Sequence, residues 1–161
     1  HIPIEGINDS KKLDPNTREK LYEQITSSCL AYAIVEISNF YIDRYNILQA
    51  TLLGFEKAYA KLDIVPDICL IDGNRIPPAL QDKATPVIRG DQLHACIAAA
   101  SILAKVHRDR LMVKLDDKYP EYGFAIHKGY GTAMHARMIQ SFGMCQVHRT
   151  TFHLASLESP E

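Results

Sequence analysis

The chain has 161 residues, of which 47% are hydrophobic, and this is enough for one globular domain with a sizeable core. Its formal net charge is −1, so a nucleic acid would have to be held by a local basic patch and not by the charge of the whole protein. The sequence has no signal peptide and no apolar run that could span a bilayer, which predicts a soluble, cytoplasmic protein with no membrane partner.

The first part of the chain is predicted to contain two helices with a strand between them. Asp14 followed by Pro15 is a typical helix start, and this helix should run to about Ser27. Residues 30–38 alternate in the manner of a strand. After a short helical turn at residues 41–45, a longer amphipathic helix is expected. Its apolar face consists of Leu48, Leu52, Phe55, Tyr59 and Leu62.

Two short strands, each leading to an aspartate, form the middle of the chain. The apolar run at residues 68–71 ends at Asp72, and a second β-like run at residues 85–88 is followed closely by Asp91. Residues 75–83 between them contain two adjacent prolines and are predicted to be a surface loop. Strand ends next to loops are where α/β proteins place their chemistry, so both aspartates are candidate site residues.

Helices and loops make up the remainder. A helix rich in small side chains is predicted over residues 93–110, with a charged last turn. Residues 116–122 are expected to form a polar connection, and residues 124–132 a glycine-bearing loop. Thr132 should cap a last helix that ends at Gly143. The alternation of strands and helices predicts an α/β layered protein.

The two aspartates have a possible common role. Two carboxylates in one cleft repel each other unless a cation lies between them, and Mg²⁺ or Mn²⁺ is the usual one. Asp72 and Asp91 would form such a pair if the ends of their strands meet. The alternative is turn chemistry, since Asp-Gly-Asn at residues 72–74 and Gly-Asp at residues 90–91 are good turn sequences.

The cysteines and histidines show no metal-ligand spacing. Cys69 and Cys96 lie in apolar runs and are predicted to be buried free thiols in a reducing compartment. For His107 and His148 we expect a core or surface role, with contact to a phosphate as the alternative.

Six motifs occur in a fixed order along the chain. They are DSKKL at 9–13, NILQAT at 46–51, LIDGN at 70–74, RGD with AASILAKVHRD at 89–109, YGFAIHKGYGT at 122–132, and HRTTF at 148–152. Together they closely resemble bacterial ribonuclease HII, the type 2 ribonuclease H, over nearly the whole chain. The resemblance implies a ribonuclease H-like fold, a mixed sheet flanked by helices, as a single ribonuclease HII-like domain over residues 1–161.

By the same resemblance the protein is expected to be a metal-dependent endoribonuclease. Such an enzyme cleaves the RNA strand of RNA–DNA hybrids and cuts 5′ of single ribonucleotides embedded in duplex DNA, a step in DNA repair. Four acidic residues of the family hold two Mn²⁺ or Mg²⁺ ions about 4 Å apart. Asp72 and Asp91 match two of the four, as catalytic residues and as metal ligands.

The other two acids belong to an Asp-Glu-Ala-Gly-Arg-Gly type motif, which this sequence lacks. Glu5 and Asp9 are the only early acids, and neither has the neighbouring residues of that motif. The sequence also begins at His1 without a methionine. We therefore expect a domain that is incomplete at its N-terminus and lacks the family's first strands. Alone it should be a weak or inactive nuclease, unless a complementing N-terminal segment is supplied.

The resemblance also implies substrate contacts. Tyr130 matches the tyrosine that stacks on the deoxyribose beside the scissile ribonucleotide, and Lys11 and Lys12 match a lysine pair near substrate phosphates. Asn74 and Lys128 are candidate contacts to the substrate backbone. The alternatives are a loop tyrosine that covers the edge of the core, and lysines that are merely exposed.

Two other functions remain open alongside the leading one. The first is a non-catalytic nucleic-acid-binding fragment, or half of a split enzyme, which would bind its partner in the presence of EDTA. The second is another metal nuclease on the same fold, which would differ in its choice of substrate. For the protein itself we expect a monomer.

Overall fold

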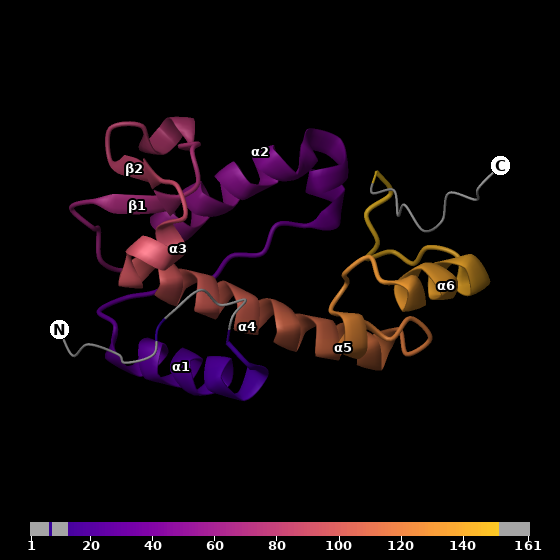
Figure 1. Cartoon of the computed structure of the whole chain (residues 1–161). Coiled ribbons are helices and arrows are strands. Elements are labelled where there is room, and N and C mark those ends of the chain that lie inside the picture. Colours follow the sequence, from indigo (N-terminus) through magenta and orange to yellow (C-terminus); the bar gives the residue numbers. More distant parts are fainter. Residues whose placement is uncertain (1–6, 8–12, 152–161) are drawn as a thin grey trace. The chain divides into compact units, whose positions relative to one another are not determined.

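The computed structural model describes residue 7 and residues 13–151, and these group into two compact units (Figure 1). The first unit comprises the described residues up to 37 together with residues 47–106. The second comprises residues 38–46 and the described residues from 107 onward. That the chain is a single domain stays a prediction.

A pair of parallel strands lies in the first unit. Strand β1 (Cys69–Asp72) pairs with β2 (Ala84–Val87), in a register that sets Cys69 opposite Ala84 and Asp72 opposite Val87 (Figure 1). The mixture of helices with a small parallel sheet confirms the expected α/β class. Because the strands are parallel, their carboxyl ends lie side by side, at the same edge of the sheet.

The connection between the strands is more ordered than the predicted surface loop. It contains a 3-10 helix, η1 (Pro78–Leu80), and the side chains of Pro77 and Leu80 are buried. The prediction of a purely exposed loop is therefore wrong at these residues. Proline fixes the backbone here, and its apolar ring contributes to the core once the segment folds back between two parallel strands.

Helix α1 (Pro15–Ser28) forms as its sequence predicts. The carboxylate Oδ1 of Asp14 accepts hydrogen bonds from the backbone N–H groups of Asn16 and Thr17, both at 3.0 Å. This satisfies two of the N–H groups that a helix start leaves without a partner, and Pro15 occupies the first turn, where it needs no N–H bond.

The main core of the first unit joins α1 to the long helix α4 (Ala95–Lys118). Figure 1 shows the two helices side by side. The cluster of buried side chains consists of Leu21, Ile25, Ile102, Leu103 and Val106. Ile102 has no exposed surface, so its side chain is packed on every side.

Helix α2 (Asn39–Ala60) confirms the predicted short turn followed by a longer helix. The two parts meet at Asn46, whose φ of 69° interrupts the helical backbone. Asparagine tolerates a positive φ better than most residues. One member of the predicted apolar face, Leu48, is 43% exposed, whereas Ala50 is buried. The small side chain allows close packing at a position that hydropathy alone does not single out.

The predicted strand at residues 30–38 is wrong. No ladder forms there, and within the described residues β1 pairs only with β2. Ile34 instead packs against the α1–α4 core, and its carbonyl accepts a hydrogen bond from Lys61 Nζ at 3.3 Å. A strand needs a neighbour that satisfies its backbone groups, and the residue pattern cannot supply one.

The predicted helix over residues 93–110 is in fact two helices, one of them longer than expected. A single turn, α3 (Gly90–Leu93), precedes α4, which continues to Lys118. The part of residues 116–122 that was predicted as a connection is thus helical up to Lys118. The extension contains strong helix formers, and no helix breaker occurs before Pro120.

The second unit contains two short helices. Within the predicted loop at residues 124–132, one turn of helix forms as α5 (Phe124–His127). Helix α6 (Ala133–Phe142) begins after Thr132, whose Oγ1 accepts a hydrogen bond from the His135 N–H, and ends at Gly143. Both of its predicted boundaries are confirmed. In the part of the chain that the structure describes, no helix has the length and hydropathy to cross a membrane.

Truncation of Ile102 to alanine should lower the free energy of unfolding by about 3 kcal/mol. The side chain is fully buried, so its removal leaves a cavity that the neighbouring side chains fill only in part. The same substitution at Ile68, which is 70% exposed, serves as the control and should cost less than about 1 kcal/mol. Urea unfolding monitored by circular dichroism measures both values. Equal effects of the two substitutions would contradict the described core.

Candidate functional site

The two strand ends are joined at the edge where Asp72 leaves β1. The backbone N–H of Gly90 donates a hydrogen bond to Asp72 Oδ1 at 2.8 Å, and the Gly73 N–H donates to the Val87 carbonyl at 2.9 Å. Asp91 follows Gly90 directly, in the first turn of α3. The structure therefore holds the Asp72 carboxylate against the residue that precedes Asp91.

Glycine at position 90 permits this approach. A Cβ atom built on Gly90 would lie 2.4 Å from Ile97 Cδ1, 3.3 Å from Val87 Cβ and 3.4 Å from Asp72 Oδ1. The residue before it, Arg89, has a left-handed backbone with φ of 56°, which turns the chain from β2 into α3. Sequence reasoning did not single out Gly90, although the Arg-Gly-Asp motif contains it.

The charges at this edge suit a hard cation. Asp72 is exposed and Asp91 is half-buried, while Asn74 is exposed two residues beyond the end of β1. Two carboxylates can supply part of an oxygen donor set, and Mg²⁺ commonly takes one or two carboxylates and keeps several waters. The donor chemistry therefore fits Mg²⁺ or Mn²⁺. Among the described residues, no group of three or more His, Cys, Asp or Glu side chains is arranged to hold a metal ion.

The remaining predicted residues lie elsewhere in the chain. Lys128 and Tyr130 belong to the second unit, between α5 and α6. Lys128 is half-buried with φ of 51°, and its carbonyl accepts a hydrogen bond from Arg108 Nη2 at 3.3 Å. Tyr130 is 55% exposed, which suits a contact residue better than a residue that covers the core. Lys11 and Lys12 fall outside the described residues.

Three buried histidines surround the Tyr130 loop, and sequence reasoning did not predict them as a group. His127 and His135 are each 6% exposed, and their rings stack with centroids 4.1 Å apart. His148 is 9% exposed, and its Nε2 lies 3.0 Å from His135 Nε2. Of the core or surface role expected for His148, the structure shows the core role. The only signal in the sequence is the frequency of histidine after residue 126, which says nothing of side-chain burial.

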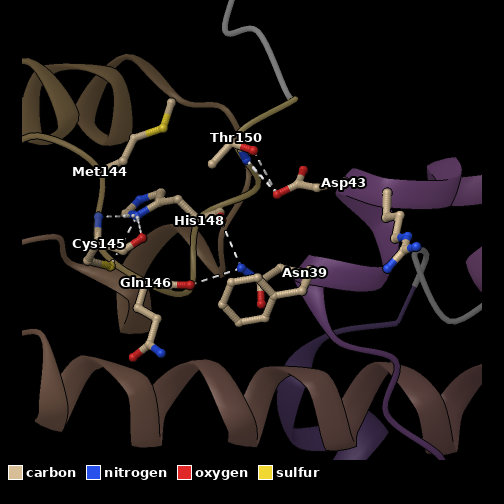
Figure 2. A pocket seen from close by; sticks show the side chains of 9 residues that line it. Asn39, Asp43, Met144, Cys145, Gln146, His148 and Thr150 are labelled. Atoms are coloured by element: carbon tan, nitrogen blue, oxygen red, sulfur yellow. Dashed lines mark hydrogen bonds between the residues drawn. The ribbon is translucent and has the colours of Figure 1, made fainter.

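A groove in the second unit shows how the HRTTF motif is anchored (Figure 2). It has a volume of about 480 Å³. Asp43 accepts four hydrogen bonds there, from the N–H and hydroxyl groups of Thr150 at 2.9 and 3.0 Å and of Thr151 at 3.1 and 2.7 Å. These bonds, chiefly the one from the Thr151 hydroxyl, lower the pKa of Asp43 to about 2. The two threonines are therefore structural.

Asn39 makes a second connection in the same groove. Its Nδ2 donates to the carbonyl oxygens of Gln146 and His148, at 2.9 Å each, and Figure 2 shows the amide directed at both. The start of α2 thus fixes the segment that carries His148. The sequence shows the Thr150-Thr151 pair, but its hydrogen-bonding partner, Asp43 on α2, lies 107 residues before Thr150.

The cysteines correct one expectation. All four are free thiols, as predicted, but Cys96 is exposed and Cys69 only half-buried, so burial of both was wrong. Cys96 lies in the first turn of α4. Burial raises the pKa of the Cys69 thiol above its ordinary value, which keeps it protonated near neutrality.

Comparison with known proteins gives consistent matches. The sequence profile described as Ribonuclease HII matches residues 2–155. Ribonuclease HII 1 of Methylibium petroleiphilum is 50% identical over 150 residues, which are 93% of this chain and 75% of that protein. Ribonuclease HII of Coxiella burnetii is 52% identical over 94% of this chain and 74% of its own length. For Ruminiclostridium cellulolyticum Ribonuclease HII, the identity is 50% over 94% of this chain and 59% of that protein.

A solved structure shares the arrangement of elements. The crystal structure of ribonuclease H2 from Pyrococcus horikoshii OT3 matches with a TM-score of 0.76 and 25% sequence identity, over 93% of this chain and 78% of that one.

The buried histidines make stability depend on pH. Burial lowers the pKa of His135 and His148 below the ordinary value of 6.5. Below that value the unfolded chain takes up protons that the folded chain does not, so the free energy of unfolding should fall as the pH falls. We expect a lower urea midpoint at about pH 5.5 than at about pH 7.5, a window in which most carboxylates keep their charge.

A His94→Gln variant, altered at an exposed histidine, should show the same dependence on pH. A urea midpoint that does not change between the two pH values would contradict the conclusion that burial lowers the pKa of His135 and His148 in the folded chain.

Proposed function

Because the chain belongs to the ribonuclease HII family, we propose that it is the metal-binding and substrate-binding part of an endoribonuclease. The reaction is hydrolysis of the RNA strand of RNA–DNA hybrids, and cleavage 5′ of single ribonucleotides in duplex DNA. The observation that carries the proposal is the Gly90–Asp72 hydrogen bond, since it keeps two carboxylate residues at one sheet edge. The ribonuclease H-like fold expected from the sequence is confirmed by the matching ribonuclease H2 structure.

Asp72 and Asp91 would hold the divalent cation, Mn²⁺ or Mg²⁺. A bound ion of this kind activates a water molecule and neutralises charge that develops on the phosphorus and the leaving oxygen. The Gly90 N–H bond orients the Asp72 carboxylate at the end of β1. Asn74, exposed beyond the end of β1, is suited to a hydrogen bond with the substrate backbone.

The substrate contacts of the second unit complete the proposal. The exposed ring of Tyr130 would pack on a deoxyribose, where a 2′-hydroxyl leaves too little room, and this favours a junction with DNA. Lys128 would contact a phosphate, as would Lys11 and Lys12 near the N-terminus. We propose that the protein works in the cytoplasm as a monomer on RNA–DNA hybrid or on duplex DNA that contains ribonucleotides.

We also propose that residues 1–161 alone cleave poorly. The sequence contains two of the four acids that the family uses, and the described residues contain no group of three metal-binding side chains. The chain spans 59% to 75% of the length of the relatives named above. A nucleic-acid-binding fragment, or half of a split enzyme, is therefore the second candidate function.

Substitution of either aspartate should weaken metal binding. Asp72→Asn and Asp91→Asn each remove a charged ligand, and we expect at least a roughly tenfold loss of Mn²⁺ affinity for each. Asp82→Asn, at an exposed aspartate of the same unit, is the matched control and should have no effect. Electron paramagnetic resonance of free Mn²⁺ measures the binding. Unchanged affinity in both site variants would refute the metal site.

A cleavage assay separates the two candidate functions. With Mn²⁺ and a labelled duplex that contains one ribonucleotide, we expect slow cleavage that EDTA abolishes, and binding that EDTA barely changes. Electrophoresis of the products and fluorescence anisotropy of the duplex give the two readouts. Rapid turnover by the 161-residue chain would contradict the proposed impairment, whereas binding without any cleavage would favour the second candidate.

A further inference from the structure

We propose that His135 is a positioning residue for Tyr130, acting through a line of hydrogen bonds that fixes the loop from which the tyrosine ring projects. The inference rests on the proposed role of Tyr130 as a substrate contact. It assigns a function to buried histidines that take no part in the proposed metal site. All the residues concerned belong to the second unit.

The first step is the bond between His135 and the loop. The His135 Nδ1 atom lies 3.0 Å from the carbonyl oxygen of Tyr130. A carbonyl oxygen can only accept a hydrogen bond, so Nδ1 must carry the hydrogen. In a neutral imidazole the other nitrogen, Nε2, is then an acceptor. Burial lowers the pKa of His135 and so favours the neutral ring.

The second step assigns the tautomer of His148. Its Nε2 atom faces His135 Nε2 at 3.0 Å, and since the latter accepts, His148 Nε2 must donate. His148 Nδ1 is then an acceptor, and the backbone N–H of Cys145 donates to it at 3.0 Å. The Cys145 carbonyl oxygen also lies 3.3 Å from His148 Nδ1, but the contact with the Cys145 N–H is shorter, and with that N–H as donor the directions are consistent from Cys145 through His148 and His135 to Tyr130. A proton added to His135 would set two donors against each other.

A third histidine holds the other side of the loop. The Tyr130 N–H donates to the backbone carbonyl of His127 at 2.9 Å. The His127 ring donates from Nε2 to the Tyr122 carbonyl at 2.8 Å and accepts the Gly129 N–H on Nδ1 at 3.1 Å. Because its ring also stacks on His135, the two histidines form one block beneath the loop.

The consequence is a fixed backbone below an exposed ring. Both peptide groups of Tyr130 are bonded, its N–H to His127 and its carbonyl to His135 and to the Thr132 N–H at 2.8 Å, while the side chain is 55% exposed. A ring held in this way loses less conformational entropy when a sugar packs against it. Phe124 packs against both His135 and His148, with ring centroids 5.7 and 5.4 Å away.

Two substitutions of His135 each keep a polar group at the position of one ring nitrogen and remove the other. Asparagine places an amide nitrogen near the Nδ1 position, so His135→Asn keeps the donor to Tyr130. Glutamine reaches the Nε2 position, so His135→Gln keeps the contact with His148 and loses the bond to Tyr130. The affinity of the 161-residue chain for a fluorescent duplex with one ribonucleotide is measured by anisotropy, in wild-type and Tyr130→Ala backgrounds.

We expect Tyr130→Ala to weaken binding by roughly tenfold. His135→Gln should weaken it by a similar factor and His135→Asn by less than about threefold. In the Tyr130→Ala background, His135→Gln should have no further effect, because the histidine acts only through the tyrosine. A merely structural role would instead lower the affinity equally in both backgrounds.

The outcomes distinguish the inference from the function on which it rests. If Tyr130→Ala leaves the affinity unchanged, the proposed role of Tyr130 fails and the inference fails with it. If Tyr130→Ala weakens binding but His135→Gln does not, only the inference is overturned. Should His135→Gln not fold, nitrogen NMR of the wild-type rings decides. Hydrogen on Nδ1 of His135 and on Nε2 of His148 supports the line, and any other pair of tautomers overturns it.

Discussion

A single hydrogen bond, from the Gly90 N–H to Asp72 Oδ1, joins the end of β1 to the start of α3 in the first unit. Parallel strands deliver their ends to one edge, but they do not by themselves bring two side chains together. The bond holds the carboxylate at the end of β1 against the backbone of the residue that precedes Asp91. A Cβ atom at position 90 would lie 2.4 Å from Ile97 Cδ1 and 3.3 Å from Val87 Cβ, so a larger residue there requires these side chains to shift. The candidate chemistry therefore depends on a backbone contact as much as on the two acids.

The sequence was informative where structure is decided locally. Asp14 and Pro15 at the start of α1, and Thr132 and Gly143 around α6, bond to their own neighbours in the chain, so their roles follow from a few residues. The strand proposed at residues 30–38 failed for the opposite reason. Its pattern was suitable, but whether a strand pairs depends on backbone groups far away in the sequence.

The site residues divide in the same way. The strand ends placed Asp72 and Asp91 at one edge by a topological argument, whereas the interest of Tyr130 came from a resemblance to a family. Nothing in the sequence indicated that Asp43 would bind Thr150 across 107 residues, or that three histidines would be buried together. Burial of a polar side chain depends on complementary partners, and only the folded chain shows which partners are available. The second unit is thus held by polar contacts that hydropathy does not reveal.

Positions 89 and 90 have opposite requirements. Arg89 adopts a left-handed backbone that glycine or asparagine would adopt at lower energy, by about 1 kcal/mol, yet it carries a long side chain. Gly90 begins α3, and a methyl group at this position would force the end of the Ile97 side chain, 2.4 Å from a built Cβ atom, to move. A library that randomises this loop should therefore favour residues that tolerate a left-handed backbone at position 89 and small residues at position 90. For protein engineering, two adjacent positions are thus limited by different factors: position 89 by the backbone conformation and position 90 by the space for a side chain.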